Sequence, residues 1–324
     1  MSRLPWSGQS IDARTLLGDD SDAFDAALDD RGSPHVAVVG EPFGGRSVVL
    51  DAAERRLDAR RIELGPGDAP RVAADAVGGT PLVIEGCQHL FARSVGGFEP
   101  LSDFLDTVAV TDTSVVAGWN SYAWSYLTAI GAVDAGMWTV VTVDGLSADR
   151  LTELARRTID PLPTFRRDDL DASLIAVRRV PVRGGLTIPI PVPDRNAIAA
   201  RRADRPSPQE AVFERLASVS GGNPGVALAL LQRCRDGDGI YPSDIYTSPT
   251  DTTVDPTAAF CLRMVLATER VRRDRLADRF EGSIDRLLAR FAREGLLTRS
   301  NGVVSIDPGG LPAAVAITDR GRIL

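Results

Sequence analysis

A glycine-rich turn near the start of the chain limits the folds that this sequence can adopt. The apolar run Val36–Val39 is followed by Gly40-Glu41-Pro42-Phe43-Gly44-Gly45-Arg46-Ser47 and then by a segment with helical character. An apolar run of this length predicts a buried strand, and the glycines permit a tight turn from that strand into a helix. Such a turn directs backbone N–H groups and the positive end of the helix dipole toward one point. The sequence therefore predicts an anion-binding turn at the edge of a parallel sheet.

The spacing of these residues matches the phosphate-binding P-loop, Gly-x4-Gly-Lys-[Ser/Thr], except that Arg46 takes the place of the lysine. Arginine keeps the positive charge but is a wide planar fork, so the replacement is not conservative. The hydroxyl of Ser47 is of the type that ligates Mg²⁺ in such loops. We expect this loop to bind ATP or ADP with Mg²⁺, although similar turns also occur for structural reasons alone. The candidate nucleotide-binding residues are Gly40, Glu41, Pro42, Phe43, Gly44, Gly45, Arg46, Ser47 and Val48.

The charged residues indicate adaptation to salt. All 37 basic residues are arginine, and the 44 acidic residues comprise 33 aspartates and 11 glutamates. A GC-rich genome alone could replace lysine with arginine, but it would not favour aspartate over glutamate. The combination resembles proteins of haloarchaea, which work in multimolar salt, where charges are screened within about 3 Å. We therefore expect a haloarchaeal protein.

Length and composition describe an ordinary globular chain. Its 324 residues, 44% of them hydrophobic and 25% charged, allow one large and one small domain. The first residues lack the apolar region of a signal peptide, and no apolar run approaches the roughly 18 residues that span a bilayer. Cys87, Cys234 and Cys261 are too few and too widely spaced for a disulfide framework or a zinc site. These observations predict a cytoplasmic protein with no membrane span and with small, buried, reduced cysteines.

A second motif lies about 40 residues after the loop, where the apolar run Pro81–Glu85 ends in a carboxylate. P-loop NTPases place such a carboxylate at the end of a neighbouring parallel strand, where it holds Mg²⁺ through water. The segment resembles the second acidic motif of AAA+ ATPases of the origin-recognition type, which reads apolar-Asp-Glu-apolar-Gln-His-Leu. The resemblance makes Glu85 the metal-associated residue, with Ser47, and puts Gly86 in the position of the catalytic glutamate. The carboxylate that would activate water is therefore missing.

His89, which follows in the same motif, could act as a base. We favour a buried, hydrogen-bonded histidine at the beginning of a helix.

A third feature is the polar residue Asn120, which follows the apolar run Thr113–Ala117. It resembles the first sensor of AAA+ proteins, which contacts the γ-phosphate or the attacking water. It is equally suited to cap the helix predicted over Ser121–Ile130. Glu85 and Asn120 are the candidate catalytic residues. We expect the aromatic residues around Asn120 to pack in the core rather than to stack on a base. The sequence has no arginine between Ser94 and Asp149, so the arginine finger of AAA+ proteins has no candidate there.

Composition changes after the α/β region. Prolines interrupt an apolar alternation over residues 161–206, which predicts an extended hairpin that packs on the core as an edge rather than a lid over a ligand. From Ser207 the pattern is helical, with a capping box to Glu210, and the turn Gly221–Pro224 divides two helices. This pair resembles the helical lid of STAND ATPases and AAA+ proteins. Gly225 takes the position of the arginine that senses nucleotide there, which leaves Arg233 or Arg235 as substitutes.

Residues 256–324 have the pattern of a winged helix-turn-helix. The predicted recognition helix runs from Ser283 to Glu294, and Asn301-Gly302 suits the tight turn of a hairpin. Arg286, Arg290 and Arg293 form a basic stripe suited to phosphates and base edges of double-stranded DNA. The segment carries 12 arginines against 8 acidic residues, whereas the whole chain has a net charge of −7. Winged helices also serve as protein-packing modules in STAND ATPases.

Together these motifs resemble an AAA+/STAND-like P-loop protein with degenerate nucleotide motifs. The predicted fold class is α/β: a P-loop parallel sheet flanked by helices, a helical lid and a C-terminal winged helix-turn-helix. The predicted segments are a leader over 1–34, the nucleotide-binding core over 35–160, the arm over 161–206, the lid over 207–240 and the winged helix over 256–324. We expect a switch that binds ATP between core and lid, hydrolyses it slowly or not at all, and acts on DNA, a protein partner or a second copy of itself. The alternatives are a non-enzymatic scaffold without nucleotide and a DNA-binding regulator with a pseudo-ATPase domain.

Overall fold

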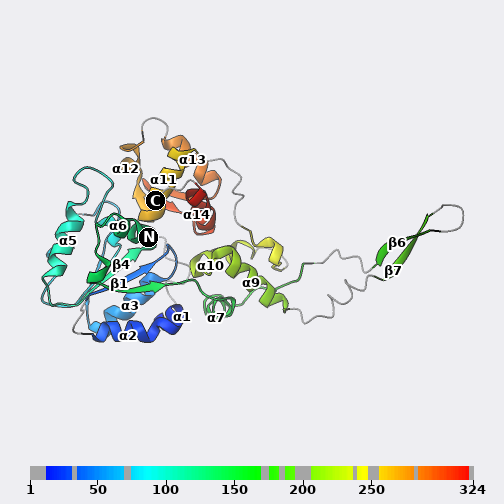
Figure 1. The fold of residues 1–324 in the computed structure, drawn as a ribbon, viewed down its shortest axis with the longest axis horizontal. Coiled ribbons are helices and arrows are strands. Elements are labelled where there is room, and N and C mark those ends of the chain that lie inside the picture. Colours follow the sequence, from blue (N-terminus) through cyan, green and yellow to red (C-terminus); the bar gives the residue numbers. More distant parts are fainter. Residues whose placement is uncertain are drawn as a thin grey trace.

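The computed structural model of the chain describes residues 12–30, 35–68, 74–168, 175–181, 187–193, 206–235, 239–246, 255–280 and 284–320. Five parallel strands form its main sheet in the order β2-β3-β4-β1-β5 (Figure 1). The strands are β1 (His35–Gly40), β2 (Arg60–Glu63), β3 (Leu82–Glu85), β4 (Val115–Asn120) and β5 (Thr139–Val143). Parallel pairing aligns the carboxyl ends of all five strands along one edge, where ligands bind in folds of this type.

Helices cover both faces of this sheet because alternate residues of each strand point to opposite faces. On one face, Val36 and Val38 of β1 join the apolar cluster that includes helices α1 (Ala13–Leu17), α2 (Ser21–Asp29), α3 (Arg46–Leu57) and α7 (Ala148–Thr158). On the other face, Ala37 and Val39 belong to a second cluster with α5 (Glu99–Ala109) and α6 (Ser121–Ala129). The segment predicted as a leader over 1–34 contains α1 and α2, and Phe24 of α2 is buried in the core.

The two helices predicted as a lid are α9 (Pro208–Ser220) and α10 (Pro224–Arg233). The capping box between Ser207 and Glu210 is present as predicted. The helices pack against α7 of the core and against each other. They therefore lie beside the β5 edge of the sheet.

The proline-rich segment contains a two-stranded antiparallel hairpin of β6 (Ile175–Pro181) and β7 (Thr187–Pro193). Proline is tolerated there because each strand has an unpaired edge. Figure 1 draws the hairpin away from the main sheet, so the expected packing on the core is wrong for these strands. Residues 182–186, which join the two strands, lie outside the described residues.

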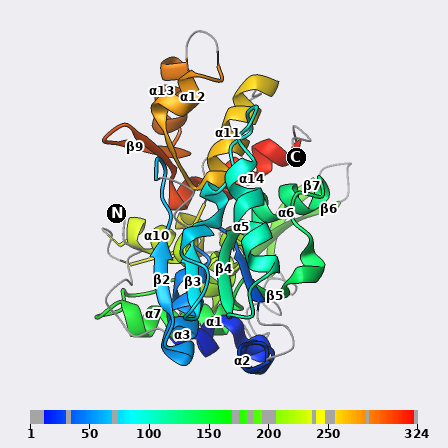
Figure 2. The same cartoon turned by 90° about the vertical axis from the view of Figure 1, so that its left-hand side faces the viewer.

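We refer to residues 255–280 and 284–320 as the C-terminal unit. It consists of α11 (Pro256–Thr268), β8 (Arg270–Arg272), α12 (Arg273–Ala277), α13 (Ile284–Arg293), β9 (Leu297–Ser300), β10 (Val303–Ile306) and α14 (Leu311–Arg320). Its strands form an antiparallel sheet in the order β8-β10-β9. Ser283, the predicted first residue of the recognition helix, lies outside the described residues. In both views the unit stands over the end of the main sheet that carries the glycine-rich turn (Figure 2).

Short 3-10 helices complete the described secondary structure: Gly18–Asp20, Cys87–His89, Ala135–Met137, Pro242–Asp244 and Pro308–Gly310. No helix of the described residues is long and apolar enough to cross a membrane. All three cysteines are free. Cys87 and Cys261 are buried as expected, while Cys234 is half-buried.

Candidate functional site

The glycine-rich turn joins β1 to α3 as the sequence predicted. Gly45 precedes the first residue of α3 with a φ of 96°, and Phe43 also has a positive φ of 65°. A side chain at Gly45 would displace the methyl groups of Leu16 in α1, and the positive φ would add strain, so glycine is strongly favoured there. The turn is therefore held in one shape by its own backbone and by the helix beneath it.

Arg46, the residue in the lysine position, is buried with only 6% of its surface exposed. Its Nη1 donates hydrogen bonds to the carbonyl oxygens of Gly40 at 3.0 Å and Trp119 at 3.2 Å. Its Nη2 donates to Oε1 of Glu269 in the C-terminal unit at 2.8 Å. Burial alone would lower the pKa of Arg46, but the Glu269 carboxylate holds that pKa above its ordinary value. The guanidinium is thus charged and faces a carboxylate supplied by the chain itself.

Glu269 was not predicted as a site residue. It follows the last residue of α11 with a φ of 60° and a ψ of −41°, a combination that non-glycine residues rarely adopt. Glycine or asparagine would adopt this backbone conformation with less strain. Strained residues of this kind are often found at functional sites. Nothing in the local sequence marks Glu269, because its partners lie far away along the chain.

Asn120 also binds Glu269. Its side-chain oxygen accepts hydrogen bonds from the N–H groups of Tyr122 and Ala123, so the predicted helix cap is confirmed. Its Nδ2 donates to the carbonyl oxygen of Leu266 and to Oε1 of Glu269, each at 3.0 Å. The same carboxylate oxygen therefore receives hydrogen bonds from the cation of the loop and from the candidate sensor.

The structure brings Ser47 and Glu85, the two residues assigned to Mg²⁺ from the sequence, into direct contact. β3, which carries Glu85, does not neighbour β1, because β4 lies between them. The Ser47 hydroxyl nevertheless reaches across and donates directly to Oε1 of Glu85, while Arg61 of β2 binds the other carboxylate oxygen. Burial alone would raise the pKa of Glu85, but these partners lower it below the ordinary value.

Gly86 occupies the catalytic-glutamate position with a φ of 86°. A Cβ added there would overlap the carbonyl oxygen of Leu64, a backbone atom that cannot move aside easily. The backbone therefore excludes a carboxylate at residue 86 in this conformation. His89 ends the short helix Cys87–His89 and is half-buried, and burial lowers its pKa to about 4. At neutral pH this imidazole is uncharged and a weak base.

The lid contacts the glycine-rich turn directly. Asn223 donates to the carbonyl oxygen of Pro42 at 2.9 Å and to Glu41 at 3.3 Å, and the N–H of Gly225 donates to the Phe43 carbonyl at 3.1 Å. The two substitutes for a sensing arginine point elsewhere: Arg233 binds the Tyr246 carbonyl and Arg235 the Pro161 carbonyl. The prediction that either arginine serves the loop gains no support from these contacts.

A cavity of about 510 Å³ opens between the turn, the end of β5, the lid and α14. Gly40, Glu41 and Gly44 form its loop side, and Ser220 and Asn223 form its lid side. The Ser220 hydroxyl is buried without a hydrogen-bond partner in the described residues, with 5% of the residue exposed. A cavity with an unpaired hydroxyl in its wall has the capacity to bind a polar ligand.

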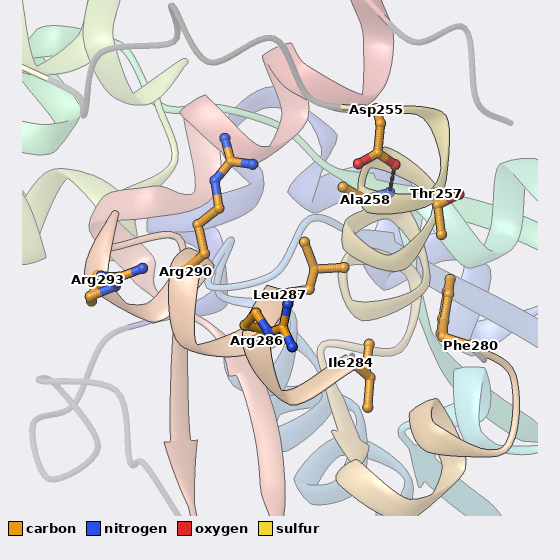
Figure 3. Close-up of a pocket in the computed structure, with 9 residues that line it drawn as sticks. All are labelled: Asp255, Thr257, Ala258, Phe280, Ile284, Arg286, Leu287, Arg290 and Arg293. Atoms are coloured by element: carbon orange, nitrogen blue, oxygen red, sulfur yellow. Dashed lines mark hydrogen bonds between the residues drawn. The ribbon is translucent and has the colours of Figure 1, made fainter. Parts of the chain in front are cut away.

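A second hollow of about 610 Å³ lies on the C-terminal unit, between the start of α11 and α13 (Figure 3). The predicted basic stripe lines it, with Arg286 and Arg293 exposed and Arg290 half-buried. Nε of Arg290 donates to Glu294 at 2.9 Å, so this arginine is partly neutralised. Ile284, Leu287 and Phe280 form an apolar floor.

The aromatic residues near Asn120 pack as expected. Trp119 is fully buried and Trp124 nearly so, with ring centroids 5.5 Å apart. The Tyr122 hydroxyl donates to Glu41 at 3.1 Å.

No model of a protein family and no curated protein matches the chain in sequence. Among solved structures it is similar to the Walker-type ATPase PABY2304 of Pyrococcus abyssi, with 12% identity, a TM-score of 0.43, and coverage of 97% of this chain and 100% of that one. It is also similar to Cdc6p of Pyrobaculum aerophilum, with 11% identity, a TM-score of 0.40, and coverage of 99% and 98%. A STAND protein of Pyrococcus horikoshii with a tetratricopeptide repeat sensor matches with 11% identity and a TM-score of 0.35 over 96% of this chain and 43% of that one. The first of these proteins is named as a Walker-type ATPase and the third as a signal transduction ATPase.

Proposed function

We propose that this protein is an AAA+/STAND-like switch whose C-terminal unit and a nucleotide phosphate compete for the same cation. The observation that carries the proposal is the carboxylate of Glu269, which accepts hydrogen bonds from both Arg46 and Asn120. A carboxylate and a phosphate are both anions that a guanidinium binds through charge-assisted hydrogen bonds. A phosphate bound at Arg46 would therefore displace Glu269 and loosen the C-terminal unit from the core.

Two unpaired groups support a polar ligand at this place. Nε of Arg46 is buried without a hydrogen-bond partner in the described residues, and so is the Ser220 hydroxyl. Buried donors without partners are rare in native proteins, and a phosphate oxygen at the guanidinium would satisfy the first of them. ATP or ADP would lie between core and lid, its phosphates on Gly40–Val48 and the rest of the molecule in the 510 Å³ cavity.

The same residues argue for slow or absent hydrolysis. Gly86 supplies no carboxylate to activate water, and His89, with a pKa of about 4, is a poor substitute. Arg233 and Arg235 do not contact the loop in the described residues. Glu85 and Asn120 remain the candidate catalytic residues, and neither can take a proton from water while bound as described.

Equilibrium binding of ATP and ADP in multimolar KCl tests the competition. The comparison is between the wild type, Glu269→Gln, and Glu214→Gln as a matched control on the exposed side of α9. Removal of the carboxylate charge at residue 269 should tighten binding by about tenfold, and the control should match the wild type. Equal affinities in wild type and Glu269→Gln would contradict the competition. An absence of binding in both would overturn the switch and favour a scaffold without nucleotide.

For the output of the switch we propose double-stranded DNA bound by the C-terminal unit as a winged helix-turn-helix. The element order α11-β8-α12-α13-β9-β10 and the antiparallel β8-β10-β9 sheet support that interpretation. In it, α13 is the recognition helix, and Arg286, Arg290 and Arg293 line the adjoining hollow. A protein partner or a second copy of this chain is the alternative.

Retention of a duplex DNA in the same salt tests this output. The variant is Arg286→Ala with Arg290→Ala. The control is Arg55→Ala with Arg156→Ala, which removes two exposed arginines from helices α3 and α7 of the α/β domain. Retention should fall in the first variant only, and the salt slope should fall with it by about two. Unchanged DNA retention in the first variant would show that the basic stripe is exposed to solvent and does not bind DNA.

A further inference from the structure

The carboxylate expected to hold Mg²⁺ has both of its oxygens bound to side chains. Ser47 donates its hydroxyl to Oε1 of Glu85, and Nη2 of Arg61 donates to Oε2. In P-loop sites that use a metal, the serine hydroxyl and the acidic strand serve the ion. Here the two candidate ligands are hydrogen-bonded to each other, and a guanidinium supplies the positive charge that an ion would otherwise bring to Glu85.

Arg61 is fixed in that position from a second side. Its Nη1 binds Asp51 and Glu54 of α3, the helix that begins at the glycine-rich turn. Only 21% of the Arg61 side chain and 17% of the Glu85 side chain are exposed. Although burial opposes ionisation, the carboxylates raise the pKa of Arg61 above its ordinary value. The guanidinium is thus a permanent cation held by three acidic residues.

These residues do not fit Mg²⁺. The ion requires a near-octahedral set of oxygen ligands at about 2.0–2.1 Å and gives up its water reluctantly. A guanidinium offers no lone pair, and its charge would repel a divalent ion placed beside Glu85. Within the described residues, no group of three or more histidine, cysteine, aspartate or glutamate side chains is arranged to hold a metal.

We propose that Arg61 replaces the metal ion of this P-loop, so that the loop takes a nucleoside di- or triphosphate free of Mg²⁺. The nucleotide part of this inference rests on the proposed function, whereas the displacement of the metal stands on the Arg61–Glu85 pair alone. Arg46 and the N-terminus of α3 supply the positive charge toward the phosphates, and Arg61 keeps Glu85 from repelling them.

Binding of Mn²⁺ alone, followed by electron paramagnetic resonance on the full nucleotide-free chain, tests the displacement. The wild type should show no specific site. Arg61→Met should gain one, because Glu85 loses its cation and becomes available to the ion together with Ser47, and adding Glu85→Gln should abolish it. Arg60→Met, on the exposed side of the same strand, is the control and should gain none. A wild-type Mn²⁺ site that Glu85→Gln removes would overturn the proposal, whether or not the Arg61 variant folds.

Nucleotide binding supplies the second measurement. Titrations of ATP and ADP with Mg²⁺ and with EDTA should give wild-type affinities that agree within about threefold. Tightening by about tenfold or more on addition of Mg²⁺ would overturn the proposal. If no nucleotide binds in either medium, the proposed function fails, and the Mn²⁺ titration still decides whether Arg61 displaces a metal.

Discussion

Oε1 of Glu269 lies 2.8 Å from Nη2 of Arg46, although 223 positions separate the two residues in the chain. This ion pair joins the C-terminal unit to the first turn of α3. It is also supported by Asn120, which donates to the same oxygen. The position of the C-terminal unit is therefore coupled to the charge of the loop.

Arg46→Lys should lower the free energy of unfolding by about 1–3 kcal/mol while the fold persists. An ammonium cannot span the Gly40 and Trp119 carbonyls and the Glu269 carboxylate, which the planar guanidinium reaches together. Urea denaturation in multimolar KCl measures the change. Arg56→Lys on the same helix is the control, because its pair with Asp29 is exposed and should contribute less than about 0.5 kcal/mol. Equal losses in the two variants would contradict the assigned role of Arg46.

Gly86→Ala should destabilise the protein by about 2 kcal/mol or more, because a Cβ at this position overlaps the Leu64 carbonyl oxygen. Gly79→Ala separates the backbone strain from the overlap with Leu64. Gly79 has a similar φ of 81°, but no heavy atom lies within 4 Å of the added Cβ. That control should cost about 1 kcal/mol from backbone strain alone. The comparison uses thermal and urea unfolding, and similar costs at the two positions would argue against the overlap.

Ser220→Ala should stabilise the protein by about 1 kcal/mol in the absence of ligand, because the variant removes a buried hydroxyl that has no hydrogen-bond partner in the described residues. Ser218→Ala on the same helix is exposed and corrects for the higher helix propensity of alanine. The quantity to compare is the difference between the two variants in free energy of unfolding. A loss of stability in Ser220→Ala relative to Ser218→Ala would mean that the hydroxyl is already satisfied.

Stability should decline as the pH falls from about 6.5 toward 4. Burial lowers the pKa of His89 to about 4 in the fold, whereas the unfolded imidazole titrates near 6.5, so protons bind the unfolded chain first. Above pH 6.5 His89 makes its full contribution to the free energy of unfolding, which amounts to at most about 3 kcal/mol. His35, whose pKa burial also lowers, adds to the same slope.

His89→Asn should therefore flatten the dependence of the unfolding free energy on pH between 8 and 4.5, and His35 should account for the remainder. Although burial opposes it, the hydrogen bond from Ser47 and the charge of Arg61 lower the pKa of Glu85 in the fold, so this carboxylate adds a loss of stability of its own at the acid end of the range. An unchanged slope in His89→Asn would assign the pH dependence to other groups.

Local chemistry allowed several parts of this structure to be predicted. The helix predicted after the glycine-rich turn is α3, and it begins at Arg46 because the glycines and the strand before them define where a helix can begin. The Ser207 capping box likewise depends on residues three apart. The ends of strands followed less closely: the apolar run Thr113–Ala117 corresponds to β4, which continues to Asn120. In each case the determining residues are neighbours in the sequence.

The charges around the loop could not be predicted in the same way. Glu269 and Arg61 have no pattern that marks them, and each acts through a contact that only the fold creates. Residue type suggested a metal at Glu85, but the arginine on the next strand changes what that carboxylate can bind. Gly86 was recognised as a missing carboxylate, whereas the Leu64 carbonyl that requires glycine there became evident only in three dimensions.

A loop whose Arg46 is matched by Glu269 and whose Glu85 is matched by Arg61 has its charges balanced within one polypeptide. The chain itself therefore neutralises these buried charges, and no bound ion or ligand is needed to offset them during folding. A chain refolded without nucleotide or divalent metal should therefore recover the same secondary structure as one refolded with both.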